Sequence, residues 1–298
     1  LRRLSDQVLR AAEQPTDRGL AIYVSLALAR TFRLPQAVEA RAVVEPTFAT
    51  RPLVAALHRM PPHVVLLLHP TCAHLYAAAD GGLRPARMMD PLRDGSPIRL
   101  PRPGEPGAAE ARDELIESFL RSVDRMLGEF RAEHPSPLVL AGADSLMARF
   151  CALSRNLQRL AGRVVLDGQD TALDLALACT EAIDNYLRTR REDALAQLKQ
   201  ALRERPRDVA SGIGDCWRSV RLRPPGMLLV EENFISPGIP DQPGGPTAKA
   251  DGEPSSPRHL HDLVDDLMEQ VVLRGGQLAL VRDGELAPHE RIALISRR

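Results

Sequence analysis

The chain has 298 residues, 44% of them hydrophobic and 26% charged, which is enough for two ordinary domains with apolar cores. No apolar run approaches the roughly 20 residues that span a bilayer and no signal peptide is apparent, so we expect a cytoplasmic protein with no membrane partner. The formal net charge is zero, which excludes a protein that is basic over its whole surface. The cysteines are widely spaced and form no C-x-x-C pair, so no zinc ribbon or redox dithiol is expected.

The first part of the chain predicts short strands and helices. Val64–Leu68 is a continuous apolar run between prolines, a pattern typical of a central strand. Thr50 is a candidate N-cap for a short helix that ends near Arg59. The other elements predicted here are a helix over Leu1–Ala12, strands over Gly19–Ser25 and Arg41–Glu45, and a hairpin over Ala73–Ala79 and Leu83–Met88.

A predicted loop, Pro91–Gly107, is rich in Pro, Gly and Arg and separates this hairpin from a second run of elements. The run begins with a long helix, Ala108–Ala132, whose apolar residues recur on one face. It continues with a strand over Pro137–Ala141, a helix from Asp144, a strand over Arg163–Leu166 and a helix from Asp170. Alternating strands and helices predict an α/β layered domain.

The charged run Arg188–Asp193 marks the predicted boundary to a second domain. Within that domain, Ser236–Pro257 has almost no large apolar residues, so we expect a mobile loop that cannot offset its ordering entropy. The regular elements predicted there are a helix near Gly212–Val220, a strand over Gly226–Glu231, a helix over His259–Leu273, and strands over Leu278–Val281 and Arg291–Ile295.

The tripeptide Gly275-Gly276-Gln277 has the sequence with which class-I release factors release a peptide. That chemistry needs the tripeptide on an exposed tip, whereas here it lies between an apolar helix and a strand. We interpret it as a helix C-cap, in which glycine supplies the left-handed residue and Gln277 begins the strand.

No catalytic residue, metal site or cofactor is predicted. The sequence contains neither the G-x-x-x-x-G-K-[ST] phosphate loop nor a G-x-S-x-G elbow. The histidines near the hairpin lack the tight spacing of zinc ligands, and the acidic residues near position 265 are typical of a solvated helix face. These groups are His58, His63, His69 and His74, and Asp262, Asp265, Asp266 and Glu269.

Arginines on the predicted hairpin and on the loop that follows it are the candidate RNA-binding residues. They are Arg84, Arg87, Arg93, Arg99 and Arg102. A guanidinium group forms bidentate hydrogen bonds with phosphate oxygens, so such a segment could contact an RNA backbone. The alternative is an ordinary solvated surface, because exposed arginine is common.

The order of several segments resembles the middle and last domains of the class-I release factors of archaea and eukaryotes. GLAIYVS, PTFATRPLVAALHR and HVVLLLHPTCAHLYAAADGGL resemble the opening of the middle domain. SPLVLAGADSLMARF and RVVLDGQDTALDLALACTEAI resemble its later strands and helices, and SGIGDCWRSVRLRPPGMLLVEENF, LRGGQLALVRD and ERIALISRR resemble the third domain. The chain is most similar to the bacterial archaeo-eukaryotic release factor family, whose relatives include these factors and Pelota.

The resemblance implies an α/β protein with two domains. Residues 1–18 would be the remnant of an N-terminal domain or a linker helix, 19–190 a middle domain with a ribonuclease-H-like mixed sheet, and 191–298 a three-layer α/β/α domain like the kink-turn-binding ribosomal proteins. In release factors the Gly-Gly-Gln lies between the hairpin and the long helix of the middle domain. The corresponding stretch here, Asp90–Gly107, contains no such tripeptide.

The function implied by the resemblance is that of a ribosome-associated factor in stalled or idle translation, which acts by occupancy rather than by peptide release. Its expected partners are the ribosome or ribosomal RNA and, through the C-terminal domain, another protein. Two alternatives stay open. One is a carboxylate- or metal-dependent nuclease or hydrolase, and the other is a protein-interaction module with no ribosome contact.

Overall fold

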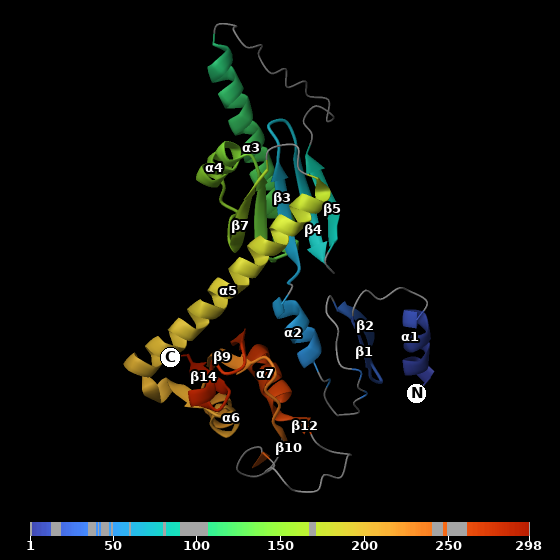
Figure 1. Cartoon of the computed structure of the whole chain (residues 1–298), viewed down its shortest axis with the longest axis vertical. Helices are drawn as coiled ribbons and strands as arrows, with labels where there is room; N and C mark the ends of the chain where they lie inside the picture. Colours follow the sequence, from blue (N-terminus) through green and yellow to red (C-terminus); the bar gives the residue numbers. More distant parts are fainter. Residues whose placement is uncertain are drawn as a thin grey trace. The chain divides into compact units, whose positions relative to one another are not determined.

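The structure, a computed structural model, describes residues 2–12, 19–34, 40, 42, 48, 50–59, 61–79, 82–89, 107–166, 171–239, 247–248 and 261–297. The chain divides into two compact units (Figure 1). One consists of Leu1–His58 together with Arg188–Arg298, and the other of Arg59–Leu187. No helix in the described ranges is long and apolar enough to cross a membrane.

The unit Arg59–Leu187 is built on a five-stranded mixed sheet with the order β5-β4-β3-β6-β7. Its strands are β3 (His63–Leu68), β4 (Ala73–Ala79), β5 (Gly82–Met89), β6 (Leu138–Gly142) and β7 (Leu160–Val165). β3 pairs with β4 in antiparallel and with β6 in parallel orientation, so it occupies the centre. The predicted central strand and hairpin are therefore confirmed.

Both faces of β3 are covered by helices. Leu66 and its even-numbered neighbours pack under α3 (Ala108–Glu133) and α4 (Asp144–Leu153). Val65 packs against the first half of α5 (Ala172–Glu204), which contributes Leu175 and Ile183. Because alternate residues of a strand point to opposite faces, an uninterrupted apolar run is required at this position. The predicted helices from Ala108, Asp144 and Asp170 are confirmed to within a few residues.

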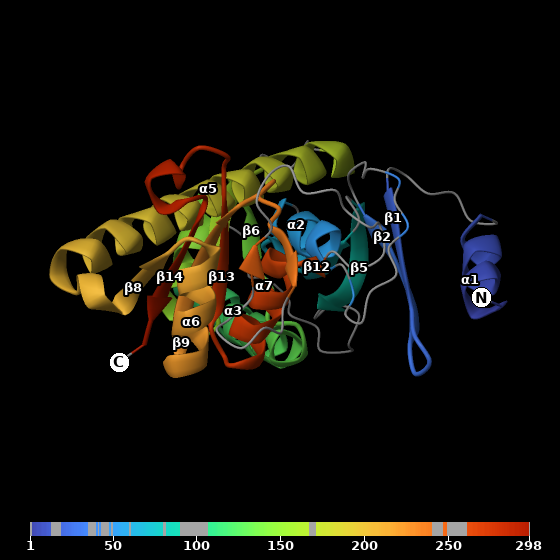
Figure 2. The ribbon, with the colours of Figure 1, turned by 90° about the horizontal axis from the view of Figure 1, so that it is seen from below.

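The C-terminal part of the other unit, Arg188–Arg298, is a three-layer α/β/α arrangement, as predicted. We call this part the C-terminal unit. Its four-stranded sheet has the order β13-β9-β14-β8, with β8 (Val209–Ser211), β9 (Pro225–Glu231), β13 (Gln277–Val281) and β14 (Ile292–Ser296). α6 (Ile213–Leu222) and α7 (Leu263–Leu273) cover one face and the second half of α5 covers the other (Figure 2). The finer resemblance to ribonuclease H and to kink-turn-binding proteins stays a prediction.

The N-terminal segment differs from the expectation. The predicted strand β1 (Gly19–Val24) is half-exposed, and it pairs with β2 (Ala29–Leu34), a strand that the sequence did not predict. The remaining elements are α1 (Arg2–Ala12) and α2 (Arg51–Arg59), both predicted. The strand expected over Arg41–Glu45 lies, apart from Ala42, outside the described residues.

The segment 19–58 is grouped with the C-terminal residues, whereas the sequence placed it in the middle domain. The physical reason is that β1 pairs only with β2 in a separate two-stranded sheet, while Val54 of α2 packs against the core between α6 and α7. The second boundary, at Leu187 and Arg188, coincides with the beginning of the predicted charged run. That run is continuous helix inside α5.

The predicted loop Ser236–Pro257 contains two short strands, β10 (Pro237–Ile239) and β11 (Thr247–Ala248), and a third, β12 (His261–Asp262), follows it. β10 pairs with β11 and with β12. The residues of this segment between the strands and after β11 lie outside the described part. The following helix begins at Leu263 rather than at His259, because the Asp262 carboxylate accepts a hydrogen bond from the backbone N–H of Val264 at 3.1 Å and so caps the helix.

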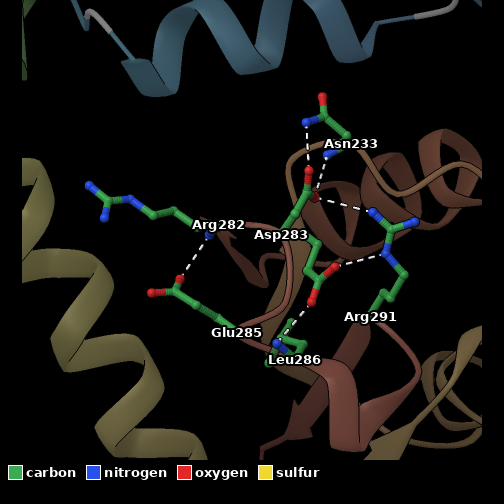
Figure 3. A network of polar contacts seen from close by, with 7 residues as sticks. Asn233, Arg282, Asp283, Glu285, Leu286 and Arg291 are labelled. Carbon is green, nitrogen blue, oxygen red and sulfur yellow. Dashed lines mark hydrogen bonds and ion pairs between the residues drawn. The ribbon is translucent and has the colours of Figure 1, made fainter.

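A buried carboxylate, that of Glu231, organises the turn between β13 and β14. Figure 3 shows its partners Leu286 and Arg291, with Asp283 and Asn233 beside them. Glu231, which is 2% exposed, accepts hydrogen bonds from the backbone N–H of Leu286 at 2.9 Å and from Nε of Arg291 at 2.7 Å. Arg291 also donates to Asp283 at 3.1 Å, and Asn233 donates to the same carboxylate at 2.7 Å. The hydrogen bond from the Asn233 side chain is the largest cause that lowers the pKa of Asp283, and the Arg291 cation adds to it.

We predict that Arg291→Met destabilises the C-terminal unit by about 3 kcal/mol, since it leaves the buried Glu231 charge without its cation. The measurement is urea unfolding followed by the fluorescence of Trp217, the single tryptophan, which lies in the core of this unit. Arg218→Met removes the exposed ion pair with Asp215 and should cost less than about 1 kcal/mol. Equal effects of the two substitutions would contradict the role assigned to Glu231.

Candidate nucleic-acid interface

Two of the predicted RNA-binding arginines, Arg84 and Arg87, lie on β5, an edge strand of the five-stranded sheet. Side chains three residues apart point to opposite faces of a regular strand. Between Arg84 and Arg87, however, the register of β4 and β5 shifts by one residue. Arg84 therefore pairs with Ala77 and Arg87 with Leu75. Both partners face the core under α3. The β-bulge therefore brings the two arginines to the same side of the sheet.

The Arg87 side chain reaches the last turns of α3. Its guanidinium lies 3.3 Å from the Glu129 carboxylate and 5.8 Å from the centre of the Phe130 ring. The ion pair is exposed, with 40% of the Arg87 side chain and 62% of the Glu129 side chain accessible to solvent. An exposed pair contributes at most about 1 kcal/mol, so a phosphate group can compete with Glu129 for the guanidinium.

Two further arginines lie where α3 ends and β7 begins. Nη1 of Arg159 donates a hydrogen bond to the Pro135 carbonyl at 2.7 Å, and Arg131 donates to the Gln158 carbonyl. Burial is the largest cause that lowers the pKa of Arg131, and the second is the nearby positive charge of Arg159. The two guanidinium groups therefore lie close enough for their charges to repel each other.

We call Arg84, Arg87, Arg131 and Arg159 the basic surface of this unit. It combines residues from β5, from α3 and from the start of β7, which are separated by tens of residues in the sequence. Sequence reasoning found Arg84 and Arg87 because they share one hairpin. It missed Arg131 and Arg159, because no local spacing connects them with β5. Arg93, Arg99 and Arg102 lie outside the described residues, so their role stays a prediction.

The histidine cluster does not assemble a metal site in the described part of the chain. His69 and His74 have ring centres 6.1 Å apart, and Sγ of Cys72 lies 3.6 Å from Nε2 of His74. His63 instead donates to the Pro61 carbonyl at 3.1 Å, and burial lowers its pKa. Among the described residues, no group of three or more His, Cys, Asp or Glu side chains is placed to hold a metal ion.

Gly275 and Gly276 end α7 in a Schellman motif. Gly275 has φ of 76° and donates its N–H to the Val272 carbonyl at 2.9 Å, while Gly276 donates to the Val271 carbonyl at 2.8 Å. This confirms the C-cap interpretation. A side chain on Gly276 would lie 2.5 Å from the Val271 side chain, so the position is packed rather than mobile.

Gln277 begins β13 and is exposed, but it does not lie on a tip. It lines a groove of about 500 Å³ between the end of α5 and the sheet, together with Gln200, Arg205 and Arg297. The Arg297 guanidinium donates to the Gly275 carbonyl and so holds the cap from the other side. The chemistry of peptide release needs a mobile tip, and this geometry provides a fixed helix end.

Comparison with known proteins identifies similar sequences and folds. Residues 62–222 match the family described as bacterial archaeo-eukaryotic release factor family 3. No curated protein matches the chain. A structure of ribosome-bound archaeal Pelota and ABCE1 is similar over 94% of this chain and 77% of that chain, with 12% identity and a TM-score of 0.50.

The structure of Dom34 from S. cerevisiae, a translation termination-like factor involved in RNA quality control pathways and interacting with Hbs1, is similar at the same level. It aligns with 83% of this chain and 67% of its own chain, with 11% identity and a TM-score of 0.50. At such identities the similarity concerns the fold, and the predicted release-factor-like α/β architecture is confirmed.

We predict that Gly275→Ala destabilises the C-terminal unit by about 1–2 kcal/mol, because an L-residue is strained in the left-handed conformation. Gly214→Ala is the matched control: Gly214 lies inside α6, where an added Cβ meets nothing within 4 Å. Alanine should stabilise the helix there by up to about 1 kcal/mol. Effects of the same sign in urea unfolding would contradict the conformational explanation.

Proposed function

The chain belongs to bacterial archaeo-eukaryotic release factor family 3, and from this membership we propose that it is a translation factor homologue that binds the ribosome through ribosomal RNA. It acts in stalled or idle translation by occupying its site, without a catalytic Gly-Gly-Gln. The observation that carries the proposal is the family match, since residues 62–222 include all of the basic surface.

The proposal of occupancy rests on where Gly-Gly-Gln is missing and where it occurs. The stretch between the hairpin and α3, Asp90–Gly107, contains no such tripeptide. The tripeptide at Gly275–Gln277 is part of a hydrogen-bonded helix cap. Neither segment therefore supplies a mobile Gln that could position a water molecule against a peptidyl-tRNA ester.

RNA contact is proposed for the basic surface. Its arginines can form charge-assisted hydrogen bonds with phosphate oxygens, and the zero net charge of the chain means that this local concentration is not a property of the whole molecule. The two similar structures are described as ribosome-bound with ABCE1 and as interacting with Hbs1. By analogy we propose a protein partner for the C-terminal unit and a cytoplasmic location for the chain.

We predict that the purified chain co-sediments with ribosomes and that Arg84→Gln combined with Arg87→Gln weakens this association several-fold. Each lost phosphate contact should reduce the slope of log affinity against log salt by about one unit or less. The measurement is co-sedimentation at two salt concentrations. Arg149→Gln is the matched control, because Arg149 has a 39% exposed side chain in an ion pair with Asp113, much as Arg87 has with Glu129.

The outcomes separate the hypotheses. If the wild type never sediments with ribosomes or subunits, the translation hypothesis fails and the protein-interaction module becomes the better account. If the wild type binds and the double variant binds equally well, the contact surface lies elsewhere. A triple variant, Arg93→Ala, Arg99→Ala and Arg102→Ala, then tests the segment that follows β5.

We also predict that the chain does not raise the hydrolysis of ribosome-bound peptidyl-tRNA above its background rate. Asp90–Gly107 contains no Gly-Gly-Gln, and the tripeptide at Gly275–Gln277 is held in a helix cap. The measurement is release of a labelled peptide from programmed ribosomes. Release that is abolished by Gln277→Ala would show that Gly275–Gln277 leaves its cap and acts catalytically. The Gln277 side chain is exposed, so this substitution should leave stability within about 0.5 kcal/mol.

A further inference from the structure

An aromatic pair lies at the end of α3 and has no role in the mechanism described so far. The rings of Phe130 and His134 are stacked, with centres 4.4 Å apart and planes inclined by 12°. Phe130 is buried at 6% exposure, whereas His134 is exposed. Since one face of the imidazole is covered by Phe130, its accessible surface is the opposite face and the ring edge.

The orientation of the imidazole is fixed by the end of the helix. Nδ1 of His134 donates a hydrogen bond to the Phe130 carbonyl at 3.1 Å, and the backbone N–H of His134 donates to the same oxygen at 3.1 Å. Nε2 is therefore directed away from the helix and is available for a polar contact. A ring held by stacking and by a hydrogen bond loses little conformational entropy when a ligand binds to it.

The surroundings of this ring are cationic. The Arg87 guanidinium lies 5.8 Å from the other member of the pair, Phe130. Arg159 donates to the carbonyl of Pro135, the residue that follows His134. Arg131 lies about one helical turn before His134. The acidic groups nearby are Glu129, which pairs with Arg87, and Glu133. Cations next to a flat exposed ring are the two components with which proteins bind single-stranded RNA: phosphate contacts and base stacking.

We infer that His134, supported by Phe130, is a stacking platform for one unpaired base of RNA whose backbone phosphates contact the basic surface. This rests on the proposed function, since it specifies the kind of RNA that the surface accepts. A base packs on the exposed imidazole face, and Nε2 can bond to a base edge or to a ribose hydroxyl group. Duplex RNA offers no free base face at such a position, so the platform selects loops, bulges or single strands.

The test uses the full chain and a short single-stranded RNA of uridines with one central 2-aminopurine, whose fluorescence falls when the base stacks. We expect the wild type to quench this fluorescence on binding. His134→Asn keeps a hydrogen-bond donor near the Phe130 carbonyl but has no ring, and it should lose the quenching and bind on the order of 10-fold more weakly. His134→Phe has a ring but cannot donate that bond or offer Nε2, and it should retain the quenching and bind more tightly than His134→Asn.

These two variants distinguish stacking from a structural role. If His134 only ends the helix, His134→Asn should bind like the wild type and His134→Phe should be the damaged variant, which overturns the inference. His69→Ala is the matched control, because it removes a histidine next to β3 that does not stack on Phe130, and it should leave quenching unchanged. A urea unfolding curve for each variant shows whether the unit is still folded.

The result is separable from the proposed function. A chain that sediments with ribosomes but does not quench 2-aminopurine keeps the proposed function and loses the platform. A chain that quenches in a His134-dependent manner but never sediments with ribosomes or subunits keeps the platform and loses the ribosome. Equal affinity of the chain for the same strand annealed to its complement would also contradict the inference, because it would show that no unpaired base is required.

Discussion

Strand β3 must bury both of its faces, and the arrangement of the unit around it follows from that requirement. Its alternate residues enter two cores, one under α3 and α4 and one against α5. Satisfying the backbone of a strand buried in this way requires a hydrogen-bonded neighbour on each side, which β4 and β6 provide. The hairpin partner β5 is thereby left at the sheet edge, where a bulge is tolerated and where Arg84 and Arg87 reach the α3 side.

Charge in this protein is a local property. The whole chain is neutral, yet the end of α3 collects guanidinium groups from three elements, and the repulsion between Arg131 and Arg159 contributes to the lowered pKa of Arg131. The Nη1 atom of Arg131 is buried and has no hydrogen-bond partner among the described residues. Such an arrangement lowers stability, because an unsatisfied donor costs about 1–3 kcal/mol.

The tripeptide Gly-Gly-Gln illustrates that chemistry depends on placement. On a mobile tip it can approach a substrate with its backbone and direct a water molecule with its amide. At the end of α7 the same residues satisfy two carbonyls of the last turn, and Gly276 packs against Val271 and Pro225. At the opposite end of β13, the Glu231 and Arg291 network fixes the β13–β14 turn. Both ends of β13 are therefore held by hydrogen bonds.

Local patterns were sufficient for most elements and for the helix cap, because apolar periodicity and left-handed glycine act within a few residues. They located the central strand at Val64–Leu68, the long helix α3 and the positive φ of Gly275. They did not show that β1 pairs with β2, that Arg87 of β5 reaches Phe130 near the end of α3, or that Arg159 reaches the Pro135 carbonyl just beyond that helix. Those relations depend on which surfaces become buried together and on a one-residue shift of register. Contacts between residues far apart in the chain decide both, and no spacing along the sequence records them.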